Sequence, residues 1–153
     1  MNALKSFLVL GLLVGLLAAA PGQAAQIEVV ESFPLETDLG VPGVRQTQEV
    51  WLEMFRAAQT QVDIEQFYVS DQAGEALAPV LASIKDAAAR GVRVRLLVDS
   101  KFFKTYPDSV NELGKLPNVQ TRTIDFSETN GVQHAKFFTI DGQQSFVGSQ
   151  NFD

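Results

Sequence analysis

The chain lacks cysteine altogether and has a single histidine, His134, among its 153 residues. Without cysteine it can form neither a disulfide nor a thiolate metal site, and it has no cysteine nucleophile. Zinc sites use three or four nitrogen, sulfur or oxygen ligands, so one histidine without cysteine argues against a zinc centre. We therefore expect no metal and no cofactor.

Positive charge is also scarce, because 12 lysines and arginines face 18 aspartates and glutamates, for a net charge of −6. An acidic chain has no general electrostatic attraction for nucleic acid or anionic lipid, so any recognition of phosphate has to be local. The hydrophobic share of 46% and the charged share of 20% are ordinary for a globular protein. The length is that of one domain.

The longest apolar run, from Phe7 to Ala20, follows Lys5 and precedes small residues that end at Ala24. This is the pattern of a secretory signal peptide cut after Ala24. The run is shorter than the roughly 20 residues of a membrane-spanning helix, and an uncleaved membrane anchor is the less favoured alternative. We expect a signal peptide at 1–24, a domain at 25–153 without a stable membrane span, and a secreted or periplasmic protein.

The rest of the chain alternates between strand and helix patterns. Short β-branched or alternating runs predict strands at 26–31, 62–70, 92–99 and 119–124, and amphipathic spacing predicts helices at 47–58, 75–90 and 107–113. Gly91 after the second helix is a C-terminal stop. A strand, a helix closed by glycine and a further apolar strand form a βαβ unit with parallel pairing. The expected fold class is α/β, with a mixed, mostly parallel sheet flanked by helices.

Two lysines and three aromatic residues lie just past the end of the strand at 92–99. Ligands of open α/β sheets bind at the carboxyl ends of the strands, so Lys101, Phe102 and Lys104 could form a substrate rim, together with Phe103 and Tyr106. The commoner role of aromatic residues in such a place is to cap the core, and the sequence favours that role.

The strand at 62–70 contains two polar residues, Glu65 and Gln66, that could point toward an active site at the edge of the sheet. Both residue types are ordinarily exposed to solvent. A solvated position is therefore the favoured interpretation for each.

The most specific pattern lies in the C-terminal segment, where HxKxxxxD is followed by GSxN: His134, Lys136, Asp141, Gly148, Ser149 and Asn151. Apolar runs flank Asp141 and Gly142, a type I′ hairpin signal that assigns Asp141 a structural role in the turn. If the strand begins by His134, the side chains of His134 and Lys136 leave the same face. Gly148 would permit a tight backbone beside the ligand.

These residue types suit a phosphodiester. An imidazole can attack phosphorus and form a covalent intermediate. The ammonium of Lys136 and the amide of Asn151 can donate to the non-bridging oxygens, whose charge has to be stabilised in the transition state. Fixed donors of this kind would replace a metal. We therefore take His134, Lys136 and Asn151 as candidate catalytic residues.

The motif resembles that of the phospholipase D superfamily of phosphodiesterases, and the likeness runs from Val29 to Asp153. The runs VVESFP at 29–34 and IEQFYVS at 64–70 are similar to the branch with lysosomal phospholipase D-like exonucleases. The resemblance implies a sandwich-like α/β domain in which two HxK motifs meet. One histidine becomes phosphorylated, while the other protonates the leaving group and later activates water, without metal.

Carried over by position, the resemblance makes His134 the nucleophile or the acid. Lys136 and Asn151 become the phosphate clamp, with Ser149 as a supporting donor and Asp141 and Gly148 as structural residues.

This chain departs from the family in having one motif and one histidine, and the family continues well past Asn151. Two explanations follow. The chain could pair with itself about a two-fold axis as a homodimer, as small secreted nucleases of the superfamily do. Alternatively, it is the N-terminal half of a longer two-motif enzyme and is C-terminally incomplete, which is the favoured explanation.

The expected function is hydrolysis of a phosphodiester, with phospholipid as the favoured substrate, by an enzyme active only as a dimer or within a longer chain. A secreted nuclease or exonuclease acting on DNA or RNA is the first alternative. A non-catalytic half-domain that binds phosphate is the second.

Overall fold

The computed structural model describes residues 25–34, 36–72 and 74–153, so the expected signal peptide at 1–24 lies outside the described residues. The elements in chain order are β1 (Val30–Glu31), β2 (Arg45–Gln46), α1 (Thr47–Ala57), β3 (Gln61–Gln66), α2 (Leu77–Ala89), β4 (Arg93–Asp99), α3 (Ser100–Phe103), α4 (Asp108–Gly114), β5 (Val119–Ile124), the 3-10 helix η1 (Ser127–Thr129), β6 (Lys136–Ile140) and β7 (Gln144–Val147). Within those described ranges, no helix has the length and apolar character to cross a membrane.

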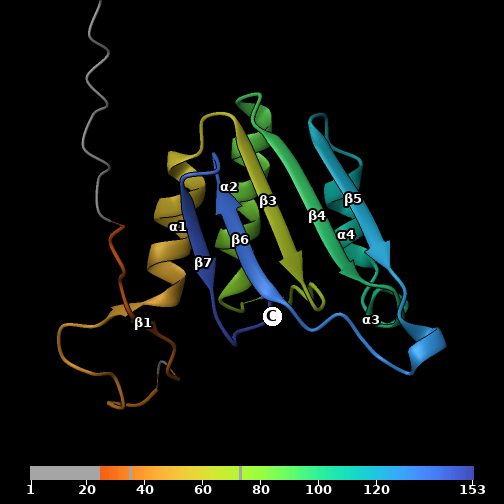
Figure 1. The fold of residues 1–153 in the computed structure, drawn as a ribbon. Helices are drawn as coiled ribbons and strands as arrows, with labels where there is room; N and C mark the ends of the chain where they lie inside the picture. The colour runs from red at the N-terminus through yellow and green to blue at the C-terminus, as the bar shows by residue number, and fades with distance from the viewer. Residues whose placement is uncertain (1–24, 35, 73) are drawn as a thin grey trace, which may run out of the picture.

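A mixed five-stranded sheet in the order β5-β4-β3-β6-β7 forms the centre of the molecule. Strands β3, β4 and β5 are parallel, whereas β6 is antiparallel to β3 and β7 is antiparallel to β6. Helices α1, α2 and α4 lie on one face of this sheet (Figure 1). The parallel pairing of β3 with β4 across α2 confirms the βαβ unit, and the α/β fold class is confirmed with it.

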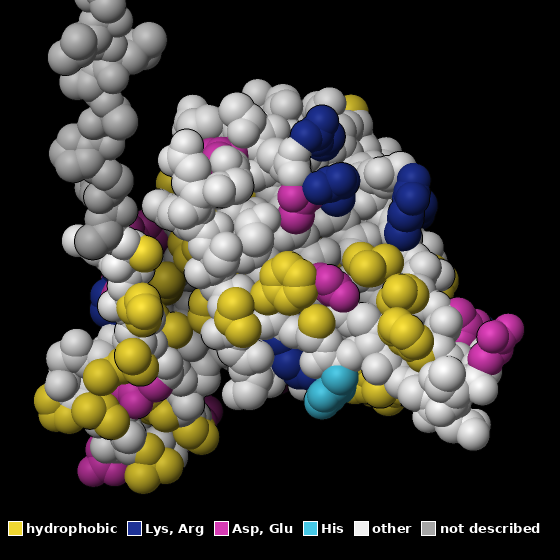
Figure 2. Space-filling model, in the orientation of Figure 1, with side chains coloured by type: hydrophobic (Ala, Val, Ile, Leu, Met, Phe, Trp, Pro, Cys, Tyr) yellow, Lys and Arg dark blue, Asp and Glu magenta, His cyan; other side chains and the backbone are white. Residues whose placement is uncertain are grey.

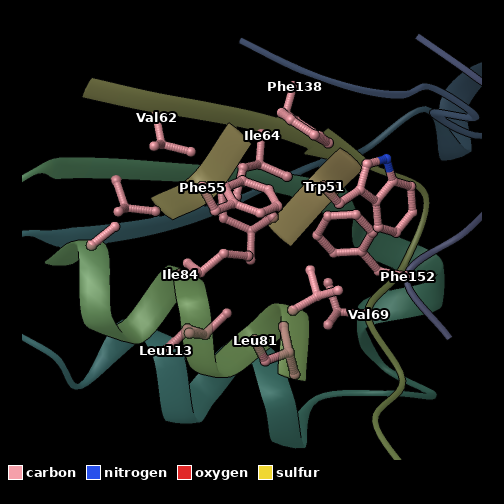
Figure 3. Packing of buried hydrophobic residues seen from close by; sticks show 14 of the residues in the cluster. Trp51, Phe55, Val62, Ile64, Val69, Leu81, Ile84, Leu113, Phe138 and Phe152 are labelled. Carbon is pink, nitrogen blue, oxygen red and sulfur yellow. The ribbon is translucent and has the colours of Figure 1, made fainter. Parts of the chain in front are cut away.

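The core lies between the sheet and its helices, and the aromatic side chain of Trp51 joins α1 to the C-terminal segment (Figure 3). Its ring centroid lies 6.1 Å from that of Phe138, 5.2 Å from Phe146 and 4.9 Å from Phe152. Phe55, one turn further along the same helix face, is fully buried against Phe138. Aromatic packing of this kind adds to the stabilisation from burial and ties the motif to α1.

The opposite face of the sheet is helix-free over the described residues, and Figure 2 shows hydrophobic and charged side chains side by side on it. Here Asp63 of β3 forms an ion pair with Arg95 of β4, with an N–O distance of 2.5 Å. Hydrogen bonding from Arg95 is the main reason why the pKa of Asp63 is lowered. This face also has Leu97 and Phe137, which are half-buried.

Two predicted strands differ from the observed ones. Of the strand predicted at 26–31, only β1 forms, and it pairs with β2 outside the main sheet. Ile27 and Val29 are 92% and 76% exposed, so local β-propensity here has no sheet face to pack against. The strand predicted at 62–70 ends at Gln66, because the chain then turns and meets Phe152 through an isolated bridge at Val69.

The hairpin between β6 and β7 has the predicted turn chemistry. Asp141 and Gly142 have φ values of 55° and 67°, as a type I′ turn requires. The Asp141 carboxylate accepts hydrogen bonds from the backbone N–H groups of Gln59, Thr60 and Gln61 at 3.0, 2.8 and 2.9 Å, and from the Thr60 hydroxyl at 2.8 Å. These bonds hold its pKa far below the usual range of aspartate and tie the hairpin to the loop before β3.

We predict that Asp141→Asn lowers the melting temperature at neutral pH. Asparagine tolerates the same positive φ, so the change removes the charge without straining the turn. Because the folded-state pKa is depressed, this stabilisation is complete above the unfolded pKa of about 3.9 and is lost as pH falls through the folded value. The difference in melting temperature from the native protein should therefore shrink as pH falls below about 4.

The control is Asp86→Asn on the exposed side of α2, which removes the same charge. Thermal unfolding followed by circular dichroism measures both. An equal loss of stability in the two variants, or a loss independent of pH, would contradict a role for the Asp141 carboxylate.

Candidate functional site

The side chains of His134 and Lys136 both lie near one aromatic ring, that of Phe67. The His134 imidazole lies edge-on to Phe67, with ring centroids 4.5 Å apart at an interplanar angle of 83°. The Lys136 ammonium lies 5.0 Å from the centroid of the same ring. Its Nζ also donates a hydrogen bond to the backbone carbonyl of His134 at 3.0 Å. Both side chains thus lie near Phe67, but β6 begins at Lys136 and His134 precedes it, so the strand on which the same-face prediction depended does not include His134.

The environments of these two groups differ. His134 is exposed (Figure 2, cyan), so its imidazole is open to a substrate. Lys136 is only 7% exposed. Desolvation lowers the pKa of Lys136, an effect that the negative charge of Asp153 opposes. A desolvated ammonium interacts more strongly with an approaching anion than one in water does.

Asn151 is brought to this end of the sheet by the segment that follows β7. The backbone of Phe152 pairs with that of Val69, and the Ser70 N–H donates to the Phe152 carbonyl at 2.8 Å. The amide of Asn151 donates to the hydroxyl of Tyr68 at 3.1 Å, while the Tyr68 hydroxyl also bonds to the Asp153 carboxylate.

Desolvation and the bond to Asp153 raise the pKa of Tyr68 to about 12, so its phenol stays protonated at neutral pH. Phe67 contacts His134 and Lys136, and the next residue, Tyr68, contacts Asn151. The turn after β3 therefore joins the three candidate catalytic residues. An imidazole, an ammonium and an amide thus lie around two consecutive residues of one turn.

A family model described as "Cardiolipin synthase, PLD-like domain" matches residues 51–153, which include the whole motif. The chain belongs to the phospholipase D superfamily. It is similar to phospholipase D Y of Dictyostelium discoideum, with 32% identity over 143 residues, and to the 5'-3' exonuclease PLD3 of Homo sapiens, with 31% identity over 140 residues. These matches cover 86% and 82% of this chain but only 32% and 28% of the two relatives.

Two solved structures share the fold. NucT from Helicobacter pylori superposes with a TM-score of 0.58 at 20% identity, covering 69% of this chain and 66% of that one. The phospholipase D family member Nuc from Salmonella typhimurium superposes with a TM-score of 0.56 at 20% identity, covering 71% of this chain and 66% of that one. The expected superfamily and the expected architecture are both confirmed.

In this phospholipase D-like domain, a steric constraint explains why position 148 is a glycine. A Cβ atom at this position would lie 2.8 Å from the ring of Phe146, and the Gly148 N–H donates to the Lys136 carbonyl at 3.1 Å. Ser149 is exposed and lines a hollow between the N-terminal segment, α1 and β7. Among the described residues no hydrogen bond joins Ser149 to His134 or Lys136, so its role as a supporting phosphate donor stays a prediction.

The predicted substrate rim divides into separate parts. Phe102 packs on Phe67 with ring centroids 3.9 Å apart, and Tyr106 packs on Tyr68 at 5.0 Å, so these two rings extend the aromatic surface beside His134. Phe103 packs instead against the core.

The two lysines of the predicted rim are exposed on α3 and just beyond it. Lys101 and Lys104 line a hollow of about 150 Å³ with Asp99 and Asp125 rather than the surface at His134. No contact of either lysine with the residues around His134 therefore supports their predicted role in a substrate rim, over the part of the chain that the structure describes.

A buried carboxylate, Asp99, holds the backbone in front of His134. It is 1% exposed and accepts from the N–H of Gln133 at 2.8 Å and from those of Lys101 and Phe102 at 2.9 and 3.1 Å. The side chain of Gln133 in turn donates to Glu65 at 2.8 Å. One acid thus positions both the loop that bears the imidazole and the helix that bears Phe102.

Sequence reasoning did not identify Asp99 or Gln133, although an acid at the end of a buried strand was a visible signal. The preference for solvated positions is wrong for Gln66, which is fully buried at the end of β3. Glu65 is half-buried, and its partner is Gln133 rather than solvent alone. Over the described ranges, no group of three or more histidines, cysteines or acids is arranged to hold a metal ion.

We predict that Asp99→Asn destabilises the fold by about 1–3 kcal/mol, because asparagine leaves at least one buried N–H without an acceptor. Amide hydrogen exchange at Gln133 and His134 should accelerate more than at β4. Exchange followed by NMR, with urea unfolding for the global stability, measures both effects. Glu128→Gln in the exposed 3-10 helix is the control. Unchanged exchange at Gln133 in Asp99→Asn would contradict the positioning role.

Proposed function

We propose that this domain provides one half-site of a metal-independent phosphodiesterase that works through a phosphohistidine intermediate. The observation that carries the proposal is the placement of His134 and Lys136 around Phe67, with the desolvated ammonium beside the exposed imidazole. The proximity of Asn151, through Tyr68, supports it.

In the first step the lone pair of a His134 ring nitrogen attacks phosphorus. The nitrogen–phosphorus bond forms as the bond to the leaving oxygen breaks, and that oxygen takes a proton from a second imidazole. Water then attacks phosphorus, gives its proton to the second imidazole, and the nitrogen–phosphorus bond breaks. Lys136 and Asn151 donate to the non-bridging oxygens in both transition states.

The second imidazole has to come from outside this chain, because His134 is its one histidine. A second copy of the chain or another part of a longer two-motif protein would supply it. In either case the enzyme requires two half-sites facing each other. Export, as the pattern at 1–24 predicts, would place this enzyme outside the cytoplasm.

Phospholipid is the substrate that we propose first. The acidic chain has no general attraction for a long polyanion, which counts against duplex nucleic acid. The similarity to phospholipase D Y supports this choice. A single-stranded nucleic acid is the second candidate. The half-buried ring of Phe102 packs on Phe67, which contacts His134, and the exposed ring of Tyr106 packs on Tyr68, so bases could stack on these two rings.

We predict that the purified chain, incubated with a phosphodiester and quenched without acid, carries on His134 the phosphoryl group together with its remaining ester substituent, because only the leaving alcohol departs when the nitrogen–phosphorus bond forms. Mass spectrometry gives an unambiguous site, since the chain has no other histidine. Phosphatidylcholine vesicles and a labelled single-stranded oligonucleotide, tested in parallel, distinguish the two substrate classes. His134→Asn should abolish the adduct, and Lys136→Met should slow its formation by about 100-fold or more. Lys115→Met, an exposed lysine after α4, is the control.

Phosphate binding without any adduct, on either substrate, by a preparation that contains both half-sites (a dimer in sedimentation, or the longer two-motif protein) would instead identify a non-catalytic half-domain. It would overturn the enzymatic proposal while leaving the fold assignment intact.

A mixing experiment identifies the source of the second imidazole. If two copies of this chain form the site, a co-folded mixture of native and His134→Asn chains has activity proportional to the square of the native fraction, because mixed dimers lack one histidine. Activity proportional to the first power of that fraction would contradict a homodimeric site. Sedimentation of the same mixtures measures whether the dimer forms.

A further inference from the structure

Gln66 is a polar residue buried in the hydrophobic core. Its side chain is 0% exposed, and it follows Val62 and Ile64 on the face of β3 that the helices cover. Within the described part of the chain, neither its Oε1 nor its Nε2 has a hydrogen-bond partner. A buried polar group without a hydrogen-bond partner destabilises the fold, whereas a methionine of similar size at this position would carry no such penalty.

The neighbour of Gln66 across the sheet is Lys136. The antiparallel register of β3 and β6 pairs these two residues directly. Both are buried on the same face of the sheet. Side chains opposite each other in an antiparallel pair have Cβ atoms about 4.5–5.5 Å apart, well within the reach of a glutamine and a lysine.

The Lys136 ammonium lacks the acceptors that a buried cation requires. It has three N–H donors, of which one bonds to the His134 carbonyl and the ammonium faces the Phe67 ring. Among the described residues no salt bridge reaches it. An uncharged carboxamide oxygen can accept from the ammonium without neutralising the charge that a phosphate needs.

We propose that Gln66 is a positioning residue of the phosphate site. Its carboxamide oxygen accepts a hydrogen bond from the Lys136 ammonium and so fixes the position of the ammonium. This hydrogen bond would give the Gln66 Oε1, opposite Lys136 in the strand register, the partner that it lacks. It would keep the ammonium charged where water is excluded and leave its remaining N–H groups for a phosphate. The inference rests on the proposed function in taking Lys136 as the phosphate clamp.

The test measures the pKa of the Lys136 side chain by NMR in the purified chain without substrate, with Lys136→Arg to assign the signal. A carboxylate at position 66 stabilises the ammonium, so Gln66→Glu should raise this pKa by about one unit or more. Gln66→Met removes the acceptor at similar volume and should lower it. Gln120→Glu, exposed on β5, adds the same charge away from Lys136 and should leave the pKa nearly unchanged.

A second measurement follows binding of inorganic phosphate by titration. Gln66→Met should weaken binding about tenfold, and Gln66→Asn, whose shorter amide falls back from Lys136, should weaken it similarly. Thermal unfolding of each variant verifies the fold. If Gln66→Glu fails to fold, the pKa of Lys136 in Gln66→Met still decides the question.

An unchanged Lys136 pKa in folded Gln66→Met would overturn the inference and leave Gln66 as a buried amide satisfied by water. Failure of the native chain to bind phosphate counts against the proposed function instead. The two failures are therefore distinguishable.

Discussion

The register of β6 against β3 is the constraint on which the site depends. It places Lys136 opposite Gln66 on the covered face of the sheet and Phe137 opposite Glu65 on the other face. Because side chains alternate along a strand, a slip by one residue would move the ammonium to the helix-free face. The carboxylate of Asp141 holds one end of this pairing through four hydrogen bonds, which explains why the motif includes an acid far from the imidazole.

At the other end of the same pairing, the site is assembled from segments that are distant in sequence. Phe67 follows β3, His134 precedes β6, and Asn151 follows β7. Each of these segments is short and irregular, so none has a conformation of its own to impose. Their positions come from bonds to buried groups: Asp99 to the Gln133 backbone, and the Phe152 backbone to that of Val69 and Ser70.

Burial explains how an acidic protein can recognise an anion. With a net charge of −6, the chain as a whole repels phosphate. Lys136 is nevertheless almost completely buried. Solvent and salt therefore screen its electric field little over the few ångströms that would separate it from a bound phosphate. The same burial lowers the lysine pKa, an effect that the charge of Asp153 opposes, and in the arrangement that we propose the neutral oxygen of Gln66 accepts from the ammonium without competing with the substrate.

The hairpin, two of the helices and the superfamily could be predicted from the sequence, because each depends on residues that are close together in the chain. The residues Asp141 and Gly142 tolerate positive φ, so the hairpin turn followed from the sequence alone. The apolar stripes of α1 and α2 and the stop at Gly91 are likewise properties of short segments, and the superfamily was evident from a motif contained in the single segment from His134 to Asn151.

Other features were decided only by the tertiary structure, since they depend on partners far away in the chain. The run at 26–31 has the composition of a strand but finds no sheet edge beyond β1. Gln66 is polar by type, yet its place at the end of a central strand buries it beside Lys136. Tyr68 and Gln133 belong to no local pattern, and Asp99 shows in the sequence only as an acid that ends a buried strand. Their roles arise where the carboxyl end of the sheet brings three loops together, because a hydrogen bond between residues more than 30 positions apart leaves no periodic trace in the sequence.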